Sequence, residues 1–179
     1  LWAIIQPLGY SIIIAWAWGT IFRVPSYLEF AIYVFSGVIV WEYFGTIVNV
    51  SMDSLLSAVG YLRQARIPFF IFQLRVPLAS LVTFGAAMIG LYVMMAGVQL
   101  IPNSGVKIPA PGLYLLQVPA FFLLLLVMFT PLAIIFSVLG AQFRDLKHIM
   151  GLVLQALFFL TPVMMQRNML NEGQLAILY

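Results

Sequence analysis

Apolar runs of helix length follow one another along this chain, separated by short polar breaks. The first, residues 1–22, would reach about 33 Å as a helix, enough to cross a hydrocarbon core of about 30 Å. Charged residues make up only 7% of the 179 residues, against roughly 25% in a soluble domain. Because so few charges cannot form a polar shell, lipid must replace water over most of the surface, and we predict an all-α membrane protein.

We expect five transmembrane helices in one domain that covers residues 1–179. Prolines and glycines between residues 101 and 112 mark an irregular loop outside the membrane. Pro119 and Pro131 are expected to kink the fourth span. The chain begins and ends inside apolar runs, so we expect a fragment truncated at both ends. The expected spans are residues 1–22, 27–50, 76–98, 113–140 and 149–161.

The segment 51–66 has a different pattern from the spans around it. Ser51 and Asp53 are plausible N-terminal caps, and Pro68 follows the segment. We therefore predict a short amphipathic helix that lies on the membrane surface. The prediction depends on apolar residues that recur every three to four positions, namely Met52, Leu55, Leu56, Val59 and Leu62.

The distribution of basic residues predicts the orientation of the chain. If residue 1 starts on the cytoplasmic side, inside loops carry five basic residues and outside loops three, which agrees with the positive-inside rule. The margin falls to four against three if Arg75 counts as buried. The inside residues are Arg63, Arg66, Arg75, Arg144 and Lys147, and the outside ones are Arg23, Lys107 and Arg167.

Several kinds of chemistry lack their residues in this sequence. The net charge of +3 comes from scattered basic residues, which argues against a nucleic-acid partner. The chain has no cysteine, one histidine (His148) and no phosphate-binding glycine loop with its lysine. We therefore expect no enzyme activity, no cofactor and no metal site in this chain. Any energy-requiring process that it carries out must then be driven by an ion gradient or by a partner. Glu42 alone could mark an ion relay inside the membrane.

Five motifs in consistent order resemble the permease subunits of bacterial ABC exporters for polysaccharides, of the O-antigen, capsule and teichoic-acid type. The resemblance covers nearly the whole chain, but the family's amphipathic segment before the first span and its sixth span are missing. The motifs are Leu1-Trp2 followed by Gln6-Pro7; Gly37 with Trp41, Tyr43 and Phe44; Tyr61 to Pro68; Phe143-Arg144-Asp145; and Phe158 to Val163, with Thr161 where the family has serine.

The resemblance implies a homodimeric permease in the bacterial inner membrane, paired with cytoplasmic ATPase subunits that bind ATP and Mg. Together they would export a lipid-linked polysaccharide. The segment 51–66 would be the coupling helix that contacts the ATPase, and residues 162–179 would form an outer re-entrant region with Thr161 and Pro162 as an outer gate. The expected ATPase-coupling residues are Asp53, Ser57, Tyr61, Arg63, Arg66, Arg144 and Asp145.

Some of these residues have a plainer interpretation as well. Arg63 and Arg66 could anchor the chain to anionic lipid, and Arg144 and Asp145 could hold their loop by an ion pair. Glu42 could line a hydrated path, pair with a basic residue, or reach the interface. Aromatic residues could stack on sugar rings or form an interfacial belt; they are Trp16, Trp18, Trp41, Tyr43 and Phe44.

Two other functions fit the same composition. A related ABC permease could export drugs or other small hydrophobic molecules. A protein of another class, an ion-coupled secondary transporter or a membrane scaffold, would be active without an ATPase. The membrane lipid is a partner under each of these interpretations.

Overall fold

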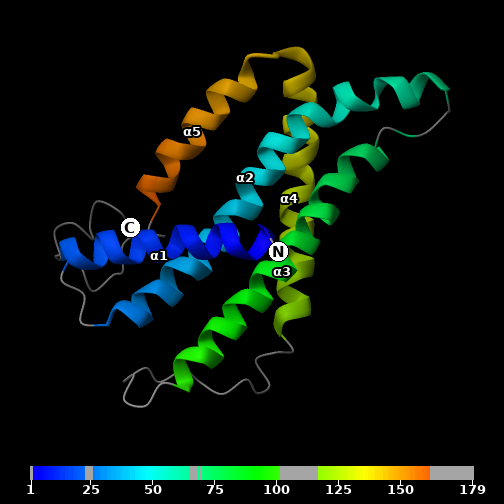
Figure 1. Cartoon of the computed structure of the whole chain (residues 1–179). Helices are drawn as coiled ribbons and strands as arrows, with labels where there is room; N and C mark the ends of the chain where they lie inside the picture. Colours follow the sequence, from blue (N-terminus) through cyan, green and yellow to red (C-terminus); the bar gives the residue numbers. More distant parts are fainter. Residues whose placement is uncertain (1, 23–25, 65–67, 69, 101–116, 162–179) are drawn as a thin grey trace. The chain divides into compact units, whose positions relative to one another are not determined.

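A computed structural model describes residues 2–22, 26–64, 68, 70–100 and 117–161 of the chain. All regular structure in these residues is helical, which confirms the all-α prediction. Figure 1 shows the five helices in chain order. Their bounds are α1 (Trp2–Phe22), α2 (Tyr27–Gln64), α3 (Phe70–Gln99), α4 (Gln117–Gln142) and α5 (Leu146–Leu160).

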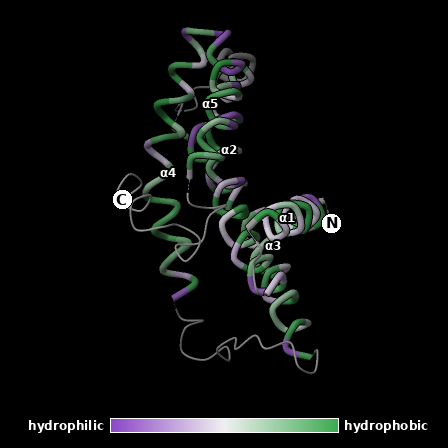
Figure 2. The backbone as a smooth tube through the Cα atoms, turned by 90° about the vertical axis from the view of Figure 1, so that its left-hand side faces the viewer, coloured by the Kyte–Doolittle hydropathy of each residue, from purple (hydrophilic) through white to green (hydrophobic). Residues whose placement is uncertain are grey.

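Three of the described helices are long and apolar enough to cross a membrane, rather than the five spans that we predicted. They are the stretch Tyr27–Ala58 of α2, and the whole of α3 and α4. Hydrophobic residues predominate along α3 and α4 (Figure 2). The 15 residues of α5 reach only about 23 Å, which is less than a hydrocarbon core of about 30 Å. Within α1, the apolar stretch found among the described residues is Leu8–Ile21, which is shorter than the stretches in α2, α3 and α4.

The helix α2 continues without a break through the segment that we expected to be a separate surface helix. Its 38 residues extend about 57 Å, so α2 is far longer than a hydrocarbon core of about 30 Å. The amphipathic pattern of residues 51–64 therefore belongs to the last turns of a long helix. The prediction was wrong because periodicity reports which side of a helix is apolar and says nothing about where the helix begins.

The residues that we took for caps lie in the interior of α2. Ser51 is fully buried, and its hydroxyl has no hydrogen-bond partner among the described residues. The Ser54 hydroxyl donates to the Ser51 carbonyl at 2.7 Å, which is a bond within the helix. The actual cap is Ser26, whose hydroxyl accepts from the Glu29 amide at 3.4 Å. Serine followed three residues later by glutamate is the sequence signature of a helix start.

The other helix bounds differ from the predictions by a few residues. The helix α3 begins at Phe70 instead of residue 76, and it continues through Pro77. The helix α4 begins four residues later than expected and continues through Pro131. The gap between the expected fourth and fifth spans, 113–140 and 149–161, is shorter than predicted, because α4 continues to Gln142 and α5 already begins at Leu146.

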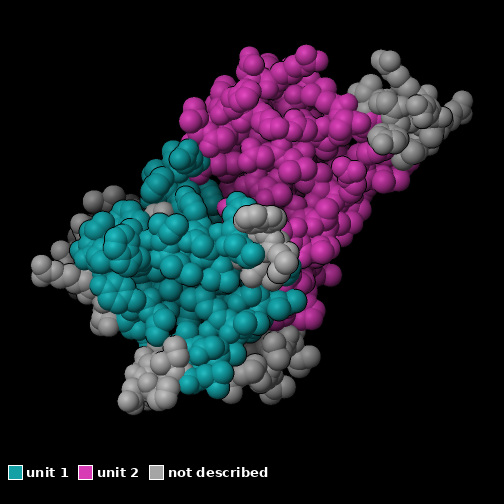
Figure 3. Space-filling model, in the orientation of Figure 1, with its two compact units in different colours: residues 1–41, 86–108, 155–179 teal, residues 42–85, 109–154 magenta. Residues whose placement is uncertain are grey.

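The chain forms two compact units, coloured separately in Figure 3. Unit 1 comprises residues 1–41, 86–108 and 155–179, within which we describe only the ranges given above. Its core lies where α1, the first half of α2 and the end of α5 pack together. Because core side chains on α2 recur every four residues, they form one stripe along the helix. The buried residues are Ile14, Ala15, Phe30, Ala31, Val34, Val38 and Phe158.

Unit 2 comprises residues 42–85 and 109–154 and contains an aromatic cluster shared by α2, α3 and α4. Tyr43 is at its centre. The ring of Tyr43 lies 5.4 Å from that of Phe84 and 5.3 Å from that of Phe129, measured between centroids. Phe84 in turn contacts Phe122 edge-on at 5.5 Å. Edge-on and tilted ring pairs are the favoured arrangements of packed aromatic residues.

Candidate functional site

The end of α4 closely approaches α2 at Met52, within unit 2. Gly140 is buried against the backbone of Met52, and a Cβ atom added at Gly140 would lie 2.5 Å from the Met52 carbonyl oxygen. Only glycine can take this position without displacing one of the helices. This approach places the residues that follow Met52 beside the turn that follows α4.

A buried hydrogen bond joins α3 to α4 near the same end of unit 2. The side-chain amide of Gln73 donates to the Ser137 hydroxyl at 2.9 Å, and both side chains are buried. The Ser137 hydroxyl donates to the Ile134 carbonyl at 2.8 Å. In an apolar environment such pairs satisfy polar groups that water cannot reach. Gly140 and Ser137, one turn apart on α4, thus contact α2 and α3 respectively.

An ion pair links α2 to the start of α5. The Lys147 ammonium donates to a carboxylate oxygen of Asp53, and about half of each side chain is exposed. Lys147 belongs to the first turn of α5, and Asp145 immediately precedes that helix. The Asp145 carbonyl accepts the amide of Ile149 at 3.3 Å, as expected of a cap residue. A carboxylate at a helix N-terminus is also favoured by the helix dipole.

These contacts bring together two segments that we predicted to bind an ATPase. Asp53 and Ser57 are exposed on α2, and Arg144 and Asp145 are exposed in the turn before α5. We call these four residues with Lys147 the polar end of unit 2. We missed Lys147 as a site residue, although its place three residues after Arg144 in a charged turn was a signal. Their role in coupling stays a prediction.

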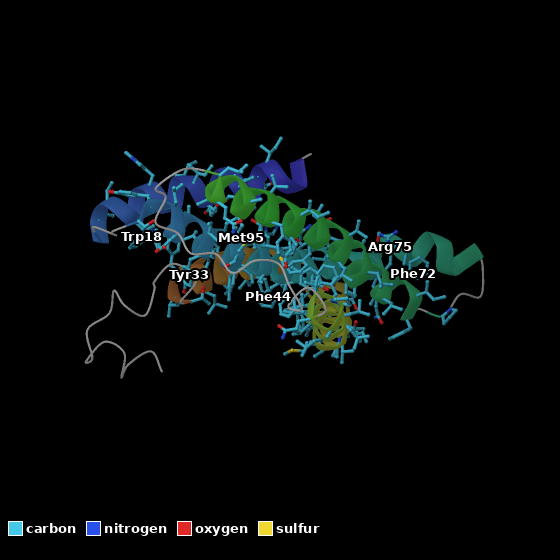
Figure 4. The ribbon with its side chains drawn as sticks, turned by 90° about the horizontal axis from the view of Figure 1, so that it is seen from below. Trp18, Tyr33, Phe44, Phe72, Arg75 and Met95 are labelled. Carbon is cyan, nitrogen blue, oxygen red and sulfur yellow. The ribbon has the colours of Figure 1, made fainter. Side chains whose placement is uncertain are left out.

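Three further residues of the predicted coupling set cannot be placed in the polar end. Tyr61 and Arg63 belong to α2 by their backbone, and their side chains are not described. Arg66 lies outside the described residues. Arg75, counted above in an inside loop, instead lies in the second turn of α3 and is exposed (Figure 4). Its place near the start of α3 keeps it close to the end that the orientation assigns to the inside.

The aromatic substrate-path candidates divide into packed and exposed residues. Tyr43 is only 3% exposed, and its hydroxyl donates to the Pro77 carbonyl at 3.4 Å, so it is a core residue without a free ring face. Trp41 packs on Phe158 with ring centroids 5.6 Å apart. Trp16 is 69% exposed on α1.

The remaining path and gate residues vary in their surroundings. Trp18 on α1 packs against the unit 1 core. Phe44 lies on α2 (Figure 4), and the centroid of its ring is 5.8 Å from that of Phe129. Glu42 is exposed. The Thr161 hydroxyl donates to the Phe158 carbonyl at 2.9 Å, and Pro162 lies outside the described residues. A role for these residues in transport stays a prediction.

The described residues contain no group of three or more histidine or acidic side chains that could hold a metal ion. Among the described residues, the side-chain hydrogen bonds lie mostly within single helices, whereas the Gln73–Ser137 bond and the Asp53–Lys147 ion pair join different helices. The polar end suits binding of another protein or of lipid headgroups, because its exposed charges on α2, in the turn after α4 and on the first turn of α5 are brought together.

The fold defines a multi-pass helical membrane protein with a polar end made from α2 and the α4–α5 turn. No family model matches the chain. Two relatives, each named "O-antigen export system permease protein RfbA" from Klebsiella pneumoniae, are 25% and 23% identical over 175 residues. Each match covers 96% of this chain and 63% of the relative. The chain is thus a distant relative of bacterial polysaccharide export permeases, which confirms the resemblance that its motifs indicated.

Proposed function

We propose that the chain is the larger part of a permease subunit that exports a lipid-linked polysaccharide across the bacterial inner membrane. The observation that carries the proposal is the similarity to two O-antigen export permeases along 96% of this chain. The chain spans 63% of the length of these relatives. Two copies of the subunit would enclose the path.

In this proposal, ATP and Mg are bound by a separate cytoplasmic ATPase, which docks on the polar end of unit 2. Support comes from the way in which α2 and the α4–α5 turn are joined. Because Met52 contacts Gly140 and Asp53 pairs with Lys147, a displacement of either segment would be passed to the other. Closure of the ATPases would be transmitted through these contacts to α2 and α4, and the two subunits would part without any bond being broken in the cargo.

The cargo is tested by deleting the gene in a strain that has no second exporter. The expected result is that polymer accumulates in the cytoplasm and disappears from the cell surface, and that a plasmid copy restores it. Unchanged surface polysaccharide in the deletion strain would refute the proposed cargo.

Docking is tested by cysteine cross-linking, for which the chain is well suited because it contains no cysteine. Ser57→Cys should cross-link to cysteines on the partner ATPase. Val82→Cys is the matched control, since Val82 is 74% exposed but lies within the apolar helix α3. Equal cross-linking at both positions, or none at Ser57, would contradict docking at the polar end.

A further inference from the structure

One side of the second half of α2 carries an uninterrupted row of polar side chains. They recur every three or four residues, and at about 100° per residue they fall within an arc of about 80°. Four of them are exposed and Asn49 is partly buried. The opposite side of the same helix faces the core of unit 2, with Ile47 and Ser51 fully buried. We call this row the polar stripe; its members are Glu42, Thr46, Asn49, Asp53 and Ser57.

The polar stripe begins well inside the stretch Tyr27–Ala58 that is apolar and long enough to cross a membrane. A carboxylate that faces lipid there is strongly disfavoured unless it has a polar partner. Among the described residues, Asp53 has such a partner in Lys147, and Glu42 forms no ion pair. The free energy of the folded chain is therefore lower if water or a polar ligand, instead of lipid, contacts the stripe.

A second copy of the chain is a poor occupant for this surface. Two copies with the same orientation in a membrane are related by an axis along the membrane normal, and a symmetric contact pairs each patch with itself. Glu42 would then face Glu42 at close range, and like charges at short distance repel. The stripe instead combines acceptors and donors on carboxylate, hydroxyl and amide groups, which complement the hydroxyl groups of a neutral sugar chain.

We propose that the polar stripe lines a hydrated path along α2 and binds hydroxyl groups of the polysaccharide that moves along it. From Glu42 to Ser57 the stripe extends about 22 Å, and its last two members, Asp53 and Ser57, belong to the polar end of unit 2, where Asp53 pairs with Lys147. The identity of the ligand rests on the proposed function, whereas the hydrated path does not. Thr46 and Asn49 are assigned here as ligand-binding residues beside Glu42.

Accessibility to water tests the path independently of any cargo. Single cysteines at Glu42, Thr46 and Asn49, in a protein with no other cysteine, are exposed in membrane vesicles to a charged, membrane-impermeant thiosulfonate. They should react at least ten times faster than Val82→Cys and Leu123→Cys, which are 74% and 66% exposed on apolar helices. Equal rates at stripe and control positions would overturn the proposal, as would disulfides between copies through Thr46→Cys.

Occupancy by polysaccharide is tested with the same Thr46→Cys protein. Labelling should be several-fold slower in membranes from cells that make the lipid-linked polymer than in membranes from cells that lack its synthesis. Equal labelling in the two strains would overturn the ligand assignment. In cells, Glu42→Leu should reduce export much more than Glu42→Gln, which keeps hydrogen bonding. Fast stripe labelling with unchanged surface polymer in the deletion strain would overturn the cargo and leave the hydrated path standing.

Discussion

Substitution of Gly140 by alanine tests the close approach of α2 and α4. The new Cβ would lie 2.5, 2.6 and 2.7 Å from the carbonyl oxygen, Cα and Cβ of Met52, where ordinary contact requires at least 3.4 Å. The helices must therefore separate by about 0.9 Å, the difference between 3.4 and 2.5 Å, and overpacking of this kind costs about 1–3 kcal/mol. Because two of these three atoms belong to backbone, a change of side-chain rotamer cannot relieve the clash.

Gly45→Ala is the matched control, because a Cβ at Gly45 would meet nothing within 4 Å. Both variants gain the helix propensity of alanine, about 1 kcal/mol over glycine. The difference between them therefore isolates the clash. At about 2–4 °C per kcal/mol for a chain of this size, the Gly140→Ala protein should melt roughly 2–12 °C below Gly45→Ala in detergent. Equal melting temperatures would refute the inferred contact between α2 and α4.

Two further predictions concern single contacts within unit 2. Asp53→Lys and Lys147→Asp should each lower thermal stability, and the double exchange should restore it. The expected coupling energy is about 0.2–1 kcal/mol, because the pair is exposed. A double variant no more stable than the single variants would show that the two side chains do not pair. Tyr43→Phe should lower the free energy of unfolding by under about 1 kcal/mol, since it removes one long hydrogen bond. Tyr43→Ala should lower it by about 3–5 kcal/mol, because it leaves a cavity. Equal losses of stability would contradict the packed position of the ring.

The class of the protein follows from the sequence alone, because apolar content and helix-length runs depend on local composition. The same holds for α1, whose observed bounds, Trp2–Phe22, agree with the predicted span 1–22. The continuity of α2 could not be predicted from the sequence, because the pattern from residue 51 onward fits both a new surface helix and the last turns of a long helix. The sequence signal that favours the long helix is the Ser26–Glu29 cap, 25 residues before the point where we placed a helix start.

Only the tertiary structure decided which residues far apart in the chain contact each other. Asp53 meets Lys147 across 94 positions, and Gln73 meets Ser137 across 64. No local pattern encodes such pairs, because they depend on how closely two helices pack. The polar stripe of α2 lies between these cases. Its spacing is written in the sequence, but only the packing of unit 2 shows that the opposite side of the helix is buried and that the stripe is left exposed.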